Sequence, residues 1–560
     1  MERRALIALA LSFVVFMAFI FFGEKLKRPV APSPQTQTAE PAAPAPPPVA
    51  APAAPSAPQP VRPPTARPAK EVVVDTPLYR AVFTELGGRV KSFQLKKYKD
   101  RMPFEPIYNF KLGPVGLEVE RYLNPEVAKI APKDLIREGA ANELPLTVSW
   151  ESKTLNVSGM NLCEASTTGL SLKDGDKGTL KFTCVSPEGL TFVKTFTFKA
   201  DSYGFDLALQ VANHTKQPLE GQINLDLSEN FAGEEASRFH FLGFNGSINN
   251  KLEDIKSESL KEAKTFTGKV EWAGLDEGYF MTTVIPESGK SWVTLSEPPK
   301  APMVASLRSP VESLAPGQAA QVSYLLYFGP KNLNDLKPLG LERAVNFGWF
   351  DFVGKPFLTF LNWINSYTHN YGWTIVIFTI LLRIVFWYPN HKSYKSMKDM
   401  QKLQPKVAKI REKYKDDKEA MNKELMGLYR TFKVNPMAGC LPMVLQLPVF
   451  IALYNVLGYS IELRHASFIP TLPFTNIVWL ADLSAKDPLL ITPLIMGATM
   501  FLQQKMTPSA GDPTQAKMMM FLPLIFTFMF LNFASGLVVY WMVNNVLSIG
   551  QQYYTNKYLT

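Results

Sequence analysis

The feature that most constrains the fold of this chain is an apolar run of sixteen residues, Trp373 to Tyr388, with one permanently charged side chain inside it, Arg383. A basic segment follows, with thirteen Lys and Arg against six Asp and Glu between residues 391 and 433, and then a second apolar run, 441–457. Basic residues directly beside apolar runs are typical of the cytosolic ends of membrane helices. The order therefore predicts a membrane helix, a cytosolic basic element and a return helix.

The length and charge of the whole chain agree with a membrane protein of several parts. At 560 residues the chain can hold two or more domains, and its net charge of +10 is concentrated beside apolar runs rather than spread over a soluble domain. We therefore expect contact with anionic lipid headgroups and no DNA partner. The three cysteines show no metal-ligand spacing, and we expect neither a metal site nor a cofactor.

The N-terminal part carries an apolar run and then a proline-rich segment. Eighteen uncharged residues, Ala5 to Phe22, come close to the length of a membrane span, and no small-residue cleavage site follows them directly. We expect an uncleaved membrane anchor over residues 1–23, with its N-terminus in the cytosol. Residues 29–70 contain fifteen prolines, a composition that favours extended chain over a packed core, so residues 24–70 are predicted to be a linker.

Residues 71–340 have the pattern of a large all-β domain. Short runs such as 190–198 mix β-branched and aromatic residues in alternation with polar ones, and Gly, Pro and Asn separate the runs. This pattern predicts a β-sandwich, made of one large domain or of two fused sheets. If the region is exported, Cys163 and Cys184 can form a disulfide; the alternative is two buried thiols. No spacing in this region indicates catalysis.

Residues 341–371 are predicted to form an amphipathic helix at the membrane interface. Phenylalanine and other apolar residues recur on one face, and Trp349 and Trp363 suit the headgroup region. The triplet Gly354-Lys355-Pro356 is expected to break this helix in two. A helix packed under the β-domain is the alternative, and the position directly before a span favours the interface.

Five apolar runs after residue 371 and the anchor together predict six membrane spans, with both termini in the cytosol. We expect membrane helices at residues 372–389, 437–458, 489–504, 518–533 and 537–556, the last with a short cytosolic tail. The turn between the last two is placed at Ala534-Ser535-Gly536. By the positive-inside rule, 390–436 and 505–517 are cytosolic and 459–488 is periplasmic. Several runs are short for a bilayer core of about 30 Å, so loop residues extend them or the membrane is thinned locally.

Arg383 is the residue that points to function. A charge inside a membrane helix costs at least a few kcal/mol unless it finds water, a partner or the interface, and none of the five runs contains Asp or Glu. One interpretation is that Arg383 snorkels to the nearby cytosolic interface. We favour a water-filled groove open to the cytosol, which would attract an acidic or polar segment that has to cross. Its polar lining is expected to come from Thr379, Gln446, Asn532 and Asn544.

The basic segment is predicted to form a helical hairpin. Apolar residues recur at steps of three and four from Met397 to Tyr414 and again from Met421 to Phe432, with a turn at 415–417 between them. Pro405 is expected to kink the first helix. Two interpretations stay open: the hairpin packs on itself, or it is a lid or docking arm for an anionic partner such as ribosomal RNA or lipid headgroups.

Several short motifs occur together in this half of the chain. They are Tyr388-Pro389 after Arg383, Leu403-Gln404-Pro405-Lys406, Val434-Asn435-Pro436, Gly439-Cys440-Leu441-Pro442, Gln446-Leu447-Pro448-Val449-Phe450 and Ser535-Gly536-Leu537. The combination resembles the YidC family of bacterial membrane protein insertases over about residues 340–555. The anchor and the β-domain resemble the Gram-negative form, so the resemblance covers essentially the whole chain.

The resemblance implies a non-enzymatic insertase and chaperone of the bacterial inner membrane, which acts on nascent membrane proteins alone or with the Sec translocon. It implies a client-binding groove formed by Arg383, Thr379, Gln446 and Trp541, with Asn532 and Tyr540 nearby. It also implies a periplasmic β-supersandwich of sugar-binding type without an established catalytic duty. The sequence ends at Thr560 without the basic extension that some members use at the ribosome, so the hairpin 391–435 and the loop 503–517 are the candidates for ribosome docking.

A membrane transporter or lipid flippase with a periplasmic ligand-binding domain is the alternative function. Transporters and flippases normally use carboxylates inside the membrane, and the apolar runs lack them. An intramembrane protease requires a buried Ser–His pair or two aspartates, and Ser535 has no histidine partner within the runs. The sequence therefore favours an insertase.

Overall fold

A computed structural model describes residues 67–100, 104–112, 115–122, 130–137, 144–153, 155–231, 241–287, 292–296, 302–415, 417–432, 434, 441–506 and 513–558. The predicted anchor at 1–23 and nearly all of the predicted linker at 24–70 lie outside these residues. The described chain falls into two compact units. One holds residues 396–437, and the other holds the β-domain and the remaining helices.

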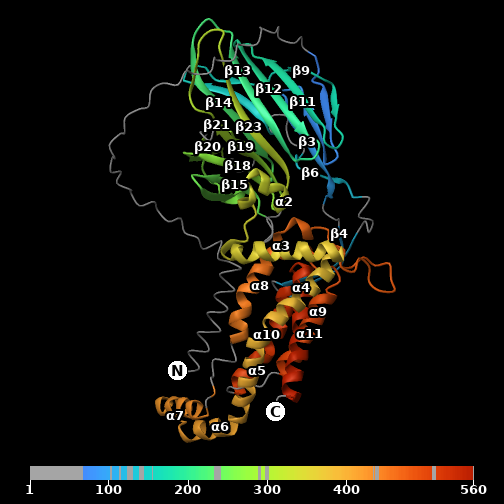
Figure 1. Ribbon diagram of the computed structural model, residues 1–560, viewed down its shortest axis with the longest axis vertical. Coiled ribbons are helices and arrows are strands. Elements are labelled where there is room, and N and C mark those ends of the chain that lie inside the picture. The colour runs from blue at the N-terminus through green and yellow to red at the C-terminus, as the bar shows by residue number, and fades with distance from the viewer. Residues whose placement is uncertain are drawn as a thin grey trace. The chain divides into compact units, whose positions relative to one another are not determined.

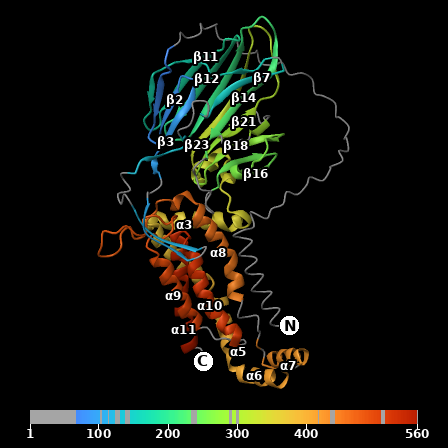
Figure 2. The ribbon, with the colours of Figure 1, turned by 180° about the vertical axis from the view of Figure 1, so that it is seen from behind.

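The β-domain consists, in the described chain, of three sheets and a separate hairpin (Figure 1; seen from behind in Figure 2). The five-stranded sheet has the order β10 (Gly169–Ser171), β1 (Glu71–Asp75), β2 (Tyr79–Thr84), β3 (Arg89–Lys99) and β6 (Pro132–Asp134). The nine-stranded sheet has the order β16 (Lys251–Lys256), β15 (Gly243–Ile248), β18 (Val270–Asp276), β19 (Phe280–Pro286), β23 (Ala319–Pro330), β13 (Gly204–Asn213), β12 (Leu190–Lys199), β11 (Lys177–Val185) and β9 (Cys163–Ala165).

The third sheet and the hairpin complete the domain. The seven-stranded sheet contains β17 (Lys264–Phe266), β20 (Trp292–Ser296), β21 (Met303–Arg308), β14 (Leu219–Glu229), β7 (Thr147–Ser152) and β8 (Val157–Ser158) in this order, with β22 (Glu312–Leu314) paired to β14. The hairpin is formed by β4 (Phe104–Leu112) and β5 (Val115–Tyr122). Short helical segments are η4 (Ser257–Ser259), α2 (Leu333–Leu336), η5 (Lys337–Leu339), η6 (Glu342–Ala344), η7 (Gly348–Phe350) and η9 (Ile461–Leu463).

Aromatic side chains form the core between the five-stranded and nine-stranded sheets. The ring centroid of Phe83 on β2 lies 5.0 Å from that of Phe196 on β12, and Phe93 on β3 lies 5.4 Å from Phe328 on β23. All four rings are buried. The alternation seen in the sequence places these rings on the inner faces, where each aromatic ring buries a large apolar area. The prediction of an all-β sandwich is confirmed, with three sheets instead of one or two.

A disulfide joins Cys163 on β9 to Cys184 on β11, and the two residues are direct partners in the strand register. Of the two alternatives left open by the sequence, the structure has the bonded pair. Disulfides persist in oxidising compartments such as the bacterial periplasm. The bond therefore agrees with a β-domain on the outer side of the membrane.

Lys194 is a fully buried lysine inside the sandwich, on β12. Its Nζ donates hydrogen bonds to the carbonyl oxygens of Gly87 and Leu146, each at 2.6 Å, and its side chain is 1% exposed. Burial, with the nearby charge of Arg89, lowers the pKa of Lys194 to about 7. The alternation of β12 places Lys194 on the same face as Phe192 and Phe196, so its inward position could have been read from the strand pattern, although lysine is rarely buried.

The low pKa of Lys194 predicts a pH-dependent stability. In the unfolded chain the lysine keeps its ordinary pKa, so between about pH 7 and pH 10 the unfolded chain binds more protons than the folded chain. The free energy of unfolding therefore rises with pH in this window, by up to about 1.4 kcal/mol per pH unit. Pulse proteolysis of the β-domain within the full chain in detergent measures this rise. The Lys194→Met variant should lack this part of the rise, and an equal rise in both proteins would contradict the assignment.

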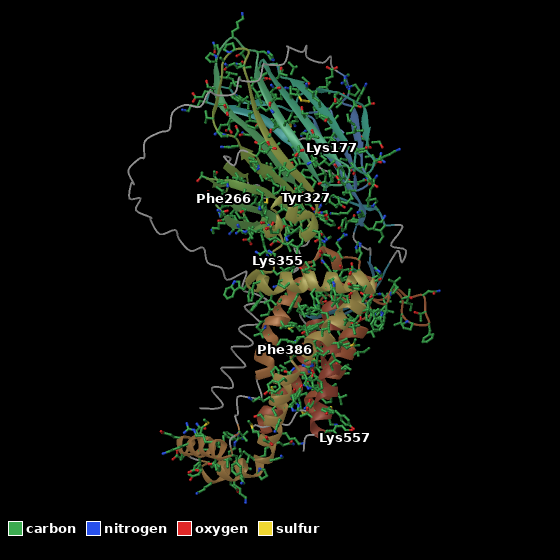
Figure 3. The ribbon with its side chains drawn as sticks, in the orientation of Figure 1. Lys177, Phe266, Tyr327, Lys355, Phe386 and Lys557 are labelled. Carbon is green, nitrogen blue, oxygen red and sulfur yellow. A yellow bond between two sulfur atoms is a disulfide. The ribbon has the colours of Figure 1, made fainter. Side chains whose placement is uncertain are left out.

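The helix predicted at residues 341–371 is continuous from Asp351 to Thr368, and the predicted break at 354–356 is wrong. Helix α3 spans Asp351–Thr368 with Pro356 inside it. Pro356 lies in the second turn, where its missing N–H removes a single helical hydrogen bond. An ion pair between Lys355 and Asp351 at 2.9 Å spans the same turn (Lys355 is labelled in Figure 3). Trp349, Phe352 and Tyr367 are exposed around this helix, as an interfacial position requires.

Five further helices, which Figure 1 shows running side by side, form a bundle. They are α4 (Tyr371–Val385), α8 (Leu441–Tyr459), α9 (Ile491–Met506), α10 (Pro513–Phe530) and α11 (Ser535–Tyr558). The turn between α10 and α11 lies at residues 531–534, so two helices are present as predicted. The turn itself was predicted too late, at 534–536, because Ser535 and Gly536 already belong to α11. Among the described residues, no single helix is both long enough and apolar enough to span a bilayer, whereas one bent pair of helices has the length and composition to do so.

That bent pair consists of α4 and α5 (Trp387–Lys402), which meet at an angle of 63°. The sequence predicted one straight helix over 372–389. A straight helix would need an N–H at residue 389 to bond the carbonyl of Val385, and Pro389 has none. The chain therefore bends at Phe386, which is labelled in Figure 3.

The basic segment forms the predicted pair of helices, α6 (Gln404–Lys413) and α7 (Lys418–Thr431). Pro405 lies in the first turn of α6, so it separates α6 from α5 rather than kinking one helix. Asp417 caps α7 by accepting hydrogen bonds from the N–H groups of Glu419 and Ala420. The Nζ of Lys406 lies 4.0 Å from the centre of the Phe432 ring, which links the two helices.

Candidate functional site

Arg383 lies in the last turn of α4 and points at α11. Its side chain is 9% exposed, and its Nη2 donates a hydrogen bond to Oγ of Ser548. The Ser548 hydroxyl donates in turn to the carbonyl oxygen of Asn544 at 2.6 Å. A cation is favourable at the C-terminal end of a helix, where the carbonyl dipoles point. The buried Nε of Arg383 finds no hydrogen-bond partner in the described chain.

Among the residues that the structure describes, no carboxylate pairs with Arg383. The apolar runs contain no Asp or Glu, and the partner that the described structure supplies is a neutral hydroxyl. A buried guanidinium with one neutral partner keeps most of its capacity to attract an anion. The site therefore presents an uncompensated positive charge inside an apolar bundle.

Gln446 and Tyr540 form a second polar contact in the bundle. Nε2 of Gln446 on α8 donates a hydrogen bond to the hydroxyl oxygen of Tyr540 on α11, and Tyr540 is 1% exposed. This contact joins two helices that are far apart in the sequence. Tyr540 and Ser548 lie eight residues apart on α11, which separates them by about 80° around the helix axis and about 12 Å along it.

Trp541 belongs to an aromatic cluster next to this contact. Its ring centroid lies 4.8 Å from Phe450 on α8, 5.3 Å from Phe530 and 6.0 Å from Phe526 on α10. Trp541 remains half-buried, and its indole N–H has no hydrogen-bond partner in the described part of the chain. The cluster supplies an apolar wall with one unused donor.

Thr379 lies one turn before Arg383 on α4, and Asn532 lies far from it, before the start of α11. Thr379 is buried, and its hydroxyl donates to the carbonyl oxygen of Ile375 in its own helix at 2.6 Å. Asn532 is exposed in the turn before α11, thirteen residues of helix away from Ser548, or about 20 Å along the axis. Arg383 bonds Ser548 on α11, and Ser548 in turn bonds the main-chain carbonyl oxygen of Asn544. The other predicted site residues with a described contact to another helix are Gln446, Tyr540 and Trp541.

Helix α11 carries polar residues that the sequence analysis did not single out. Asn545 donates to Oγ1 of Thr499 on α9 at 3.4 Å, and Gln551 donates to the carbonyl oxygen of Trp387 at 3.1 Å. The helix is therefore tied to its neighbours by side-chain amides. Asn544, Ser548 and Gln551 recur at steps of four and three, and this periodicity is the signal that could have identified the polar face.

Comparisons with known proteins decide the family. The family model described as 60Kd inner membrane protein matches residues 363–560, and that described as YidC periplasmic domain matches residues 121–360. The membrane protein insertase YidC of Citrifermentans bemidjiense is 44% identical over 567 residues, which cover 100% of this chain and 99% of that protein. The chain belongs to the YidC family of membrane protein insertases. It is accordingly an insertase of the inner membrane with a periplasmic domain, and not an enzyme.

Other YidC relatives match at full length. Those of Syntrophus aciditrophicus and Geobacter sulfurreducens are 40% and 42% identical, and each alignment covers 100% of this chain and at least 98% of the relative. A crystal structure described as an active YidC insertase with the first transmembrane domain resolved is 18% identical, with a TM-score of 0.36, over 87% of this chain and 93% of that chain. A galactose mutarotase-like protein from Clostridium acetobutylicum matches 46% of this chain and 94% of its own, at 11% identity and a TM-score of 0.29.

Proposed function

We propose that this YidC-family chain inserts and folds inner-membrane proteins by receiving their polar segments at Arg383, next to the Gln446–Tyr540 contact and Trp541. The observation that carries the proposal is the buried guanidinium of Arg383, which has a neutral hydroxyl as its partner. A polar or acidic segment entering hydrocarbon loses its hydrogen bonds to water. A guanidinium with free donor capacity offers a replacement inside the membrane and lowers that barrier.

The aromatic cluster suits the apolar part of the same client. Trp541 and the rings of Phe450 and Phe530 offer an apolar surface beside the charge. A client helix that leaves water has polar ends and an apolar centre. The charge of Arg383 can bind a polar end, and the aromatic cluster can bind the apolar centre. Phe521 and Ile525 are exposed on the other side of α10, about 140–180° around its axis from Phe530, where they suit contact with lipid.

We assign six membrane spans to the chain, with the N-terminal anchor and the five-helix bundle crossing the bilayer and both termini in the cytosol. The basic segment 390–436 and the loop 505–517 then lie in the cytosol, because they are rich in Lys and Arg relative to 459–488. The bundle helices α4 and α9 are short, with 15 and 16 residues, and local thinning of the membrane accommodates short spans.

We further assign partners by charge. The helices α6 and α7 and the loop 503–517 present basic residues suited to anionic lipid headgroups and to ribosomal RNA. Nascent membrane proteins are the clients, which the chain takes over alone or together with the Sec translocon. No metal, cofactor or DNA enters this proposal.

Site-specific photo-crosslinking tests where the client passes. A photoreactive residue in place of Trp541 should crosslink to a stalled client during insertion. The control position is Val546, which is 52% exposed on the same helix and lies about 140° around its axis from Trp541. The proposal predicts adducts from position 541 and few from 546. Equal adducts from both positions would show that the client does not use this face of α11.

A further inference from the structure

Ser548, the hydrogen-bond partner of Arg383, takes part in two hydrogen bonds. Its oxygen accepts the hydrogen bond from the Arg383 guanidinium, and its hydroxyl proton is given to the carbonyl oxygen of Asn544 at 2.6 Å. The side chain of Ser548 is 2% exposed. Because the proton of the hydroxyl is committed to Asn544, the lone pairs of the oxygen face the guanidinium. Ser548 is thus oriented as an acceptor.

The position of Ser548 is fixed by contacts on either side of it. Gln551, one turn further along α11, donates to the carbonyl oxygen of Trp387, just beyond the bend of α4. Asn545, one turn earlier, donates to Thr499 on α9. The hydroxyl therefore stays opposite Arg383 because α11 is bonded to the start of α5 on one side of Ser548 and to α9 on the other.

The chemistry of a hydroxyl as partner differs from that of a carboxylate. A carboxylate would form a bidentate ion pair with arginine and occupy its donors permanently. A hydroxyl provides one neutral hydrogen bond, which an incoming carboxylate replaces with a stronger, charge-assisted one. A neutral acceptor thus holds the guanidinium in place and leaves it open to exchange.

We propose that Ser548 is a positioning residue, which holds the Arg383 guanidinium toward the bundle interior until an acidic group of the client displaces its hydroxyl. This inference rests on the proposed function, because it assigns to Ser548 a role that acts through Arg383. It predicts that the identity of residue 548 controls how strongly insertion depends on client charge.

The test uses the full-length chain in proteoliposomes, with two versions of one single-span client whose tail carries either Asp or Asn at the same positions. Ser548→Ala should lower the initial rate of insertion of the Asp-tailed client about three- to tenfold, because the guanidinium is no longer held. Ser548→Thr keeps the hydroxyl and should restore most of the rate. Ser548→Asp should lower the rate more for the Asp-tailed client than for the Asn-tailed client, since a fixed carboxylate at residue 548 competes with the acidic tail for Arg383.

Thr555 provides a matched control on the same helix. It is buried, and its hydroxyl also donates to the carbonyl oxygen four residues earlier, that of Gln551, at 2.9 Å. Thr555→Ala removes the same kind of hydrogen bond two turns beyond Ser548 on α11 and should leave the ratio of the two client rates unchanged. If Thr555→Ala and Ser548→Ala have the same effect, Ser548 has only a structural role and the inference is wrong.

A double substitution separates this inference from the proposed function. In the Arg383→Ala background, Ser548→Ala should produce no further loss, because the residue acts through the arginine. Independent, multiplying losses would overturn the positioning role while leaving Arg383 as the site. Normal insertion by Arg383→Ala alone would overturn the proposed function, and the role of Ser548 with it.

Discussion

Replacing Arg383 with alanine is expected to lower the insertion of clients with acidic tails by about tenfold or more. The variant removes a buried charge-assisted hydrogen-bond donor, and such bonds are worth about 1.5–3 kcal/mol, where 1.4 kcal/mol corresponds to a factor of ten. Arg383→Lys keeps the charge and should retain most activity, whereas Arg383→Glu should be the most impaired. Insertion is scored in cells depleted of their own insertase, with clients that carry neutral or acidic tails.

Lys557 gives the control for a general effect of basic residues. It lies in the last turn of α11 and its ammonium rests over the ring of Tyr553 at 5.7 Å, away from the site (labelled in Figure 3). Lys557→Ala should insert both kinds of client like the unmodified chain. If the alanine, lysine and glutamate variants of Arg383 all insert clients equally well, the arginine is a snorkelling residue. Insertion then depends on the shape of the bundle and on membrane thinning instead of on this charge.

The second large effect is expected at Gly497, where α9 and α10 approach each other. A Cβ atom at this position would lie 2.0 Å from Oγ1 and 3.1 Å from Cβ of Thr527, so rotation of the threonine side chain cannot relieve the clash. Gly497→Leu should therefore force the helices apart and destabilise the bundle by about 3 kcal/mol or more. Thermal unfolding in detergent, followed by size-exclusion chromatography of heated samples, measures the loss.

Gly550 is the matched control for that substitution. It lies in a helix of the same bundle, α11, and a Cβ atom added there would meet nothing within 4 Å. Gly550→Leu should leave the midpoint of unfolding unchanged or raise it slightly, because leucine favours helix more than glycine does. Similar losses from both substitutions would mean that close packing at Gly497 is not what holds α9 to α10.

The β-domain and the bundle could be predicted because their patterns are repeated over many residues. The alternation in strands such as β12 fixes which face is buried, and the apolar runs fix where α8 to α11 lie. Arg383 stood out because it is the single permanent charge in its run. A lone charge against an apolar background is a strong local signal.

The features that were missed depend on contacts between segments far apart in the chain. The bond from Arg383 to Ser548 depends on how α4 packs against α11, and no local pattern of the sequence shows this packing. The burial of Lys194 is an exception, because the alternation of β12 places Lys194 on the same face as Phe192 and Phe196. Asn532 looked like part of a span, but the preceding helix ends at Phe530. The bend at Phe386 was accessible from the sequence, since Pro389 removes the hydrogen bond that a straight helix needs, but the continuous apolar run masked it.

The measurement that tests the central claim most directly is a charge-swap cycle between residue 383 and the client tail. Purified Arg383 and Arg383→Glu chains are placed in liposomes without a membrane potential, and each is given clients with acidic or basic tails of equal length. The account predicts that the arginine chain favours acidic tails and that the glutamate chain loses these but regains the insertion of basic tails. If Arg383→Glu impairs both clients to the same extent, the charge at residue 383 does not select the segment that crosses, and the account is contradicted.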